Sequence, residues 1–166
     1  MDYLDKCLET IINKFEGGSQ IVNHSDDPGG LTKYGISKKS YPDLDIENLS
    51  YQESVAIYRK DYAKKIKFDK LCLISPKFAF SMLDFAINSG PERAIKSAQE
   101  ISKVVKDGII GPQTLAGLTR LNDGEGNLAF LLNAERARFL ATLSTFDTFG
   151  RGWMRRVMQI STENLV

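Results

Sequence analysis

Residues 15–37 read FEGGSQIVNHSDDPGGLTKYGIS, and this segment ends a helical pattern and begins a glycine-rich one. Before it, apolar residues recur at spacings of three and four: Leu4, Leu8, Ile11, Ile12 and Phe15. This spacing is typical of one face of a helix, for which Asp2 is the expected N-cap. Because the pair Gly17-Gly18 is a stop signal, the helix should end near Glu16.

The glycine-rich segment itself predicts a small irregular lobe. Two short pieces with strand character, residues 20–22 and 31–34, stand among turn residues. Such pieces favour a hairpin that is held by turns on both sides. We therefore expect a small β-rich insertion directly after the first helix.

Helical signals dominate from Ser37 to the end of the chain. A capping box at residues 50–53 begins one helix, and Ser75 followed by Pro76 begins another. Apolar periodicity predicts further helices at four places: from Pro91, from Pro112, over about residues 128–143 and after Gly150. The predicted class is mainly α, with the one small hairpin lobe.

Composition excludes several classes of protein. The chain has 166 residues, with 22 Lys and Arg against 21 Asp and Glu, and a net charge of +1. A charge this small provides no general attraction to nucleic acid, and no apolar run approaches the ~18 residues that stable membrane insertion needs. Two cysteines and one histidine form no metal or disulfide framework, so we expect no metal and no cofactor.

Glu16 is the first candidate catalytic residue. It is expected at the C-terminal end of an apolar helix, where the negative helix end, partial burial and the nearby Asp26 and Asp27 would raise the pKa of its carboxyl group. A carboxyl group that stays protonated near neutral pH can serve as a general acid. Position alone fits a solvated glutamate at a helix end as well.

Two aspartates and a hydroxyl group follow Glu16 in the chain: Asp26, Asp27 and Thr32. A protonated carboxyl group paired with a second carboxylate is the minimum apparatus of a glycosidase. However, residues 27–30 also fit a plain β-turn with Asp27 at its first position. These residues taken alone leave both interpretations open.

Taken together, several segments resemble family 108 of the glycoside hydrolases. These are bacterial and phage N-acetylmuramidases that are also described as secretion activator proteins. The resemblance rests, in chain order, on residues 15–18, 27–37, 56–62, 84–90, 107–114 and 145–153. It implies a lysozyme-like catalytic half over residues 1–90 and a helical, peptidoglycan-binding-like half over residues 91–166, packed as one compact unit.

The resemblance also implies an activity and site residues. It implies cleavage of the β-1,4 bond that follows N-acetylmuramic acid, with Glu16 as the essential acid. Asp27 matches the family motif and is favoured as the second carboxylate. The stretch before it is longer than the common family spacing, which leaves Asp26 as an alternative. The order of Glu16, Asp27 and Thr32 is similar to that of phage lysozymes, in which the aspartate and threonine hold the attacking water and the sugar inverts.

Other residues are candidates for contact with the substrate. Tyr34 could stack on a pyranose ring, Asn88 could pair with an N-acetyl group, and Asp26 is a third candidate. The structural alternatives are hairpin packing for Tyr34 and a helix C-cap for Asn88. Asp84 is expected to hold a local hydrogen-bond network.

The expected partner is the glycan strand of peptidoglycan. The first residues are acidic and amphipathic, which does not fit a secretory signal. We therefore expect a protein made in the cytoplasm that acts on the cell wall in the periplasm, after delivery by a holin or a dedicated exporter. A non-catalytic peptidoglycan-binding protein or an accessory factor for protein secretion is the alternative, and it leaves Glu16, Asp27 and Thr32 unexplained.

Overall fold

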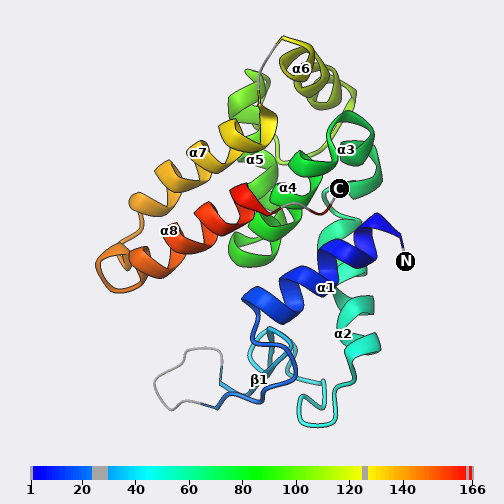
Figure 1. Ribbon diagram of the computed structural model, residues 1–166, viewed down its shortest axis with the longest axis vertical. Helices are drawn as coiled ribbons and strands as arrows, with labels where there is room; N and C mark the ends of the chain where they lie inside the picture. The colour runs from blue at the N-terminus through cyan, green and yellow to red at the C-terminus, as the bar shows by residue number, and fades with distance from the viewer. Residues whose placement is uncertain (1, 24–29, 125–126, 164, 166) are drawn as a thin grey trace. The chain divides into compact units, whose positions relative to one another are not determined.

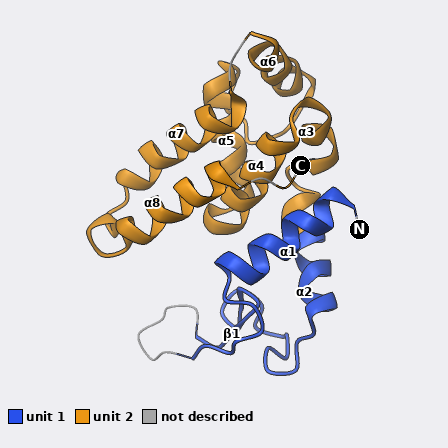
Figure 2. Cartoon of the chain, in the orientation of Figure 1, with its two compact units in different colours: residues 1–60 blue, residues 61–166 orange. Residues whose placement is uncertain are grey.

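The computed structural model describes residues 2–23, 30–124, 127–163 and 165 (Figure 1). Its described residues form eight α-helices and one two-stranded antiparallel sheet, so the mainly α class is confirmed. Figure 2 shows the two compact units into which the chain divides, residues 1–60 and residues 61–166. Within the described part, no helix combines the length and hydropathy that a bilayer crossing requires.

Helix α1 (Tyr3–Phe15) begins unit 1 at the predicted N-cap. The Asp2 carboxylate accepts a hydrogen bond from the Asp5 backbone N–H at 2.7 Å, and this bond, with the nearby Arg59 guanidinium, holds the pKa of Asp2 below its usual range. Arg59 forms ion pairs with Asp2, at 3.1 Å, and with Asp5. The end of α2 (Tyr51–Tyr58) therefore lies against the start of α1.

The hairpin lobe contains β1 (Thr32–Lys33) and β2 (Ile36–Ser37). Tyr34 and Gly35 join the two strands with φ values of 52° and 74°, which is the type I′ turn that suits a two-residue hairpin. On its other side, Thr32 pairs with Val22 in a single bridge. The strand character predicted for residues 20–22 therefore amounts to one bridge rather than a strand.

Unit 2 is built around α4 (Pro76–Ser89), which begins at the predicted cap, Ser75. The side chains of residues 78–86 are all buried, as expected for a helix surrounded by others. Helix α4 packs against four neighbours: α3 (Phe68–Ile74), α5 (Pro91–Ser102), α7 (Leu128–Ala141) and α8 (Phe146–Thr162). Helix α6 (Pro112–Asp123) packs against α3, α5 and α7.

One helix boundary differs from that expected from the sequence. Helix α8 begins at Phe146 and not after Gly150. A Cβ at Gly150 would lie 2.7 Å from the Phe146 ring, so the glycine allows this ring to pack closely on the first turn of the helix. The compact units divide at residues 60 and 61. The predicted halves meet at residues 90 and 91, between α4 and α5, which pack together within unit 2.

Candidate active site

Glu16 is the C-cap residue of α1, at the point where the chain folds back into the hairpin lobe. Its backbone N–H donates to the Ile11 carbonyl at 3.1 Å, and the Gly18 N–H donates to the Ile12 carbonyl at 2.9 Å. The Tyr34 N–H then donates to the Gly18 carbonyl at 3.0 Å. These bonds tie the hairpin turn to the end of the helix, beside the half-buried Glu16 side chain.

The turn approaches Glu16 so closely that only a glycine fits at residue 35. A Cβ built on Gly35 would lie 2.6 Å from Oε2 of Glu16 and 2.5 Å from the hydroxyl oxygen of Tyr58. Real Cβ atoms essentially never come within 3.0 Å of another heavy atom in this way. The Glu16 carboxyl group and the Tyr58 hydroxyl group therefore border the same small volume at the turn.

Tyr58, at the end of α2, holds the hairpin turn beside Glu16. Its side chain is buried, and its hydroxyl group donates to the Tyr34 carbonyl at 2.8 Å. The end of α1, the hairpin turn and α2 thus meet around Glu16. Sequence analysis missed Tyr58, although it lies within the segment 56–62 that carries part of the family resemblance, because nothing local indicates a bond to a carbonyl in another element.

Two further predicted residues, Thr32 and Tyr34, lie in the same hairpin. The Thr32 hydroxyl donates to the Gly30 carbonyl at 3.0 Å, so its proton is committed and its oxygen can accept a hydrogen bond. The Tyr34 ring meets the Tyr51 ring edge-on at 5.9 Å, and the Lys33 ammonium lies 5.6 Å from its centroid. The ring therefore contributes to hairpin packing while it stays half-buried.

Asp26, Asp27 and Asn88 are the remaining candidates. Asp26 and Asp27 lie outside the described residues. Asn88 belongs to unit 2, where its Oδ1 accepts hydrogen bonds from Arg136 at 3.2 Å and from Ser89 at 3.1 Å. Glu16, Thr32 and Tyr34 all belong to unit 1.

Asp84 is fully buried and accepts hydrogen bonds from two guanidinium groups. Arg136 donates to its Oδ2 at 2.6 Å, and Arg156 donates to its Oδ1 at 2.8 Å. The three residues come from α4, α7 and α8. Asp84 thus holds a hydrogen-bond network within unit 2, and Asn88 shares that network through Arg136. Within the described residues, no group of three or more His, Cys, Asp or Glu side chains could hold a metal ion.

We expect Gly35→Ala to reduce any activity that depends on Glu16 by about 100-fold, since displacement of a reacting group by ~1 Å can have that effect. The new methyl group would displace the Glu16 carboxyl group or the Tyr58 hydroxyl group. Gly30→Ala is the matched control, because Gly30 also has a positive φ, of 66°, but no atom of the described residues lies within 4 Å of the added Cβ. Equal activities of the two variants would show that the close approach at Gly35 does not position Glu16.

The chain is similar to known proteins in both sequence and structure. The sequence profile described as glycosyl hydrolase 108 matches residues 9–90, and that of a predicted peptidoglycan domain matches residues 93–158. The structure of Brucella abortus SagA is similar to this chain at 31% identity, covers 98% of each chain and has a TM-score of 0.82. No curated protein sequence matches. By its sequence profile and its likeness to a solved structure along nearly its whole length, the chain belongs to glycosyl hydrolase family 108.

Proposed function

We propose that the protein is a lysozyme-type N-acetylmuramidase that cleaves the β-1,4 bond after N-acetylmuramic acid. The family supports glycoside hydrolase activity, and the second profile supports peptidoglycan as the partner. The observation that carries the finer proposal is the half-buried Glu16 carboxyl group, held at the end of α1 against a glycine in the hairpin turn. A partly desolvated carboxyl group at a negative helix end suits a general acid.

In the proposed reaction, Glu16 protonates the glycosidic oxygen while the bond to the anomeric carbon of muramic acid breaks. Asp27 orients the attacking water or stabilises the positive charge that develops on the sugar. The Thr32 oxygen accepts a hydrogen bond from that water, because its own proton is donated to the Gly30 carbonyl. We propose that the sugar inverts, since a hydroxyl group beside the carboxylate helps to hold a water but does not help a carboxylate nucleophile.

Three further residues are proposed to contact the substrate. The half-buried Tyr34 ring is proposed to stack on a pyranose ring. Asn88 is proposed to contact an N-acetyl group through its Nδ2, because its Oδ1 is held by Arg136 and Ser89. Asp26 stays a candidate for binding.

Digestion of purified Gram-negative sacculi tests which glycan bond is cleaved and whether the protein is a hydrolase. After borohydride reduction, mass spectrometry should find N-acetylmuramitol at the new ends. In a separate sample that is not reduced, proton NMR of the early product should show the α-anomer. Glucosaminitol ends would indicate cleavage of the other glycan bond, and 1,6-anhydromuramic ends would indicate a lytic transglycosylase. Binding to sacculi without any new reducing ends would favour the alternative, a non-catalytic binding or secretion accessory protein.

The second carboxylate can be identified by paired variants. We expect Asp27→Asn to reduce hydrolysis by about 100-fold or more, because general base catalysis contributes ~10²–10⁴-fold. Asp26→Asn makes the same chemical change one residue earlier and should reduce hydrolysis less than Asp27→Asn does. An inactive Asp26→Asn beside an active Asp27→Asn would reverse the two assignments.

We also propose that the enzyme acts on the wall in the periplasm. Peptidoglycan lies outside the cytoplasmic membrane, so the protein must cross that membrane, through a holin or a dedicated exporter. Expression in the cytoplasm should lyse cells only when a holin is co-expressed. Lysis without such a partner would contradict this route.

A further inference from the structure

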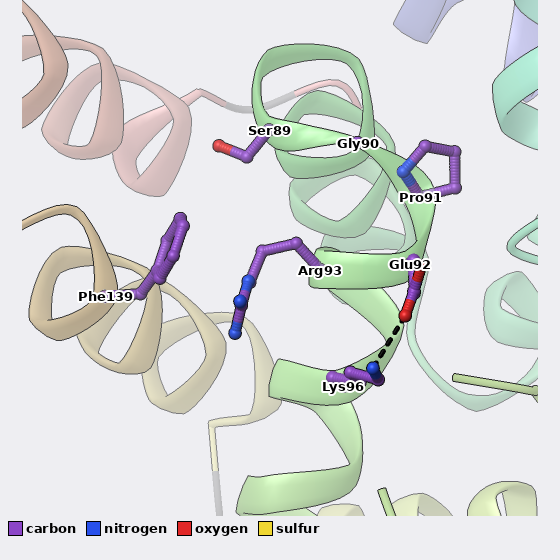
Figure 3. A pocket seen from close by; sticks show the side chains of 7 residues that line it. All are labelled: Ser89, Gly90, Pro91, Glu92, Arg93, Lys96 and Phe139. Atoms are coloured by element: carbon purple, nitrogen blue, oxygen red, sulfur yellow. Dashed lines mark hydrogen bonds and ion pairs between the residues drawn. The ribbon is translucent and has the colours of Figure 1, made fainter. Parts of the chain in front are cut away.

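Unit 2 contains an open cavity that none of the proposed catalytic residues lines. It has a volume of about 490 Å³ and lies where the end of α4, the first turns of α5 and the C-terminal end of α7 meet. Figure 3 shows Arg93 reaching from α5 across this cavity toward Phe139 on α7, with the Glu92–Lys96 pair on the same helix. This size falls within the ~300–1,000 Å³ range of ligand pockets.

Arg93 differs from the other basic residues around it. Its guanidinium carbon lies 4.4 Å from the centroid of the Phe139 ring, a cation–π contact that holds the group in place. In the part of the chain that the structure describes, no hydrogen-bond acceptor is assigned to its guanidinium N–H groups. A guanidinium group that is held by its face keeps its edge, with five N–H donors, available.

The neighbouring cations are already paired with carboxylates. Lys96 pairs with Glu92 at 2.6 Å, Lys106 with Glu100 at 2.5 Å and Arg138 with Glu135 at 2.7 Å. A second cavity of about 270 Å³ continues along α5 and shares Arg93 and Lys96 with the first. Arg93 therefore lines both cavities. Its charge acts on the neighbouring Glu92, but in the described part of the chain it forms no ion pair of its own.

We propose that this cavity binds a carboxylate of the peptide stem of peptidoglycan, a choice of ligand that rests on the proposed function. The planar edge of Arg93 matches a carboxylate in a two-point hydrogen bond. Because Arg93 already covers the Phe139 ring, that ring is not open for stacking with a neutral sugar, which favours the peptide over the glycan.

Binding can be measured by calorimetry on the full chain. The probes are the disaccharide N-acetylglucosaminyl-N-acetylmuramic acid with its tetrapeptide stem, and the same disaccharide with its lactyl carboxyl group blocked as a simple amide in place of the stem. The first probe should bind saturably and the second should bind at least tenfold more weakly. Arg93→Gln should weaken binding of the first probe by about 10- to 100-fold, the effect of losing charge-assisted hydrogen bonds, and Arg93→Lys should lose less.

Two controls separate this site from the rest of the protein. Arg151→Gln removes an exposed arginine of α8 and should leave binding unchanged. Arg120→Gln, at an exposed arginine of α6, should also bind the tetrapeptide probe as the wild type does. Because the readout is binding, a failure of the proposed hydrolysis would leave this result untouched. Unchanged binding in Arg93→Gln, equal binding of both probes, or the absence of saturable binding would each overturn the proposal.

Discussion

Replacing Glu16 with glutamine should leave the protein folded and remove nearly all hydrolysis of peptidoglycan. The two side chains have nearly the same shape, so the contacts with the Gly35 turn persist, while the proton that protonates the leaving oxygen is lost. General acid catalysis contributes ~10²–10⁴-fold, and the rate of reducing-end release should fall by at least that amount. The measurement is release of reducing ends from sacculi at equal concentrations of folded protein.

Glu9→Gln is the matched control for this experiment. Glu9 lies on the same helix, is exposed, and undergoes the same chemical change. We expect wild-type rates from it. If Glu16→Gln keeps more than about a tenth of the wild-type rate, its loss is too small for a general acid, and the role proposed for Glu16 would be wrong.

Asp84→Ala should destabilise unit 2 by about 3–5 kcal/mol, the usual effect of removing one partner from a buried ion pair. The variant would leave the fully buried Arg136 without its carboxylate and would also take an acceptor from Arg156. That loss is a large share of the ~5–15 kcal/mol that stabilises a typical protein. Urea denaturation followed by the fluorescence of Trp153, the single tryptophan, reports on this unit because Trp153 lies in α8.

Two further variants show whether the Asp84–Arg136 ion pair is responsible for the loss of stability. Asp123→Ala removes an exposed aspartate of α6, and such a surface change should move the stability by no more than about 0.5 kcal/mol. The double variant Asp84→Leu with Arg136→Met should be more stable than Asp84→Ala, because apolar residues can replace a buried pair. A loss below about 1 kcal/mol in Asp84→Ala would mean that Arg136 finds other acceptors.

Features that depend on near neighbours in the chain could be predicted from the sequence. The caps Asp2, Ser50 and Ser75 each bind a backbone N–H three residues ahead, so a short pattern contains both partners. The position of Glu16 at the end of α1 follows for the same reason, because the Gly17-Gly18 stop signal is adjacent. The family resemblance, confirmed by the comparisons, extended these local patterns to the fold as a whole.

Features that join distant parts of the chain could not be predicted in this way. Asp84 and Arg136 are 52 residues apart, and Tyr58 and Tyr34 are 24 residues apart. Each pair forms only once helices and hairpin have packed, and periodicity contains no information on which polar side chains then meet. Glycine at residue 35 signals a turn, but its closeness to Glu16 is a property of the folded lobe.

The Tyr58 hydroxyl group donates its hydrogen bond to the backbone carbonyl of residue 34, so this bond does not involve the Tyr34 side chain. The turn therefore keeps its anchor whichever side chain occupies that position, and at a φ of 52° asparagine or glycine would fit with less strain than tyrosine. The backbone anchor of the turn is thus independent of the side chain at residue 34, although the Tyr34 ring adds its contact with Tyr51. Under the proposed role of Tyr34 in sugar stacking, position 34 is a place where the preference for different glycans can be varied, in evolution or by a directed library, while the backbone anchor is kept.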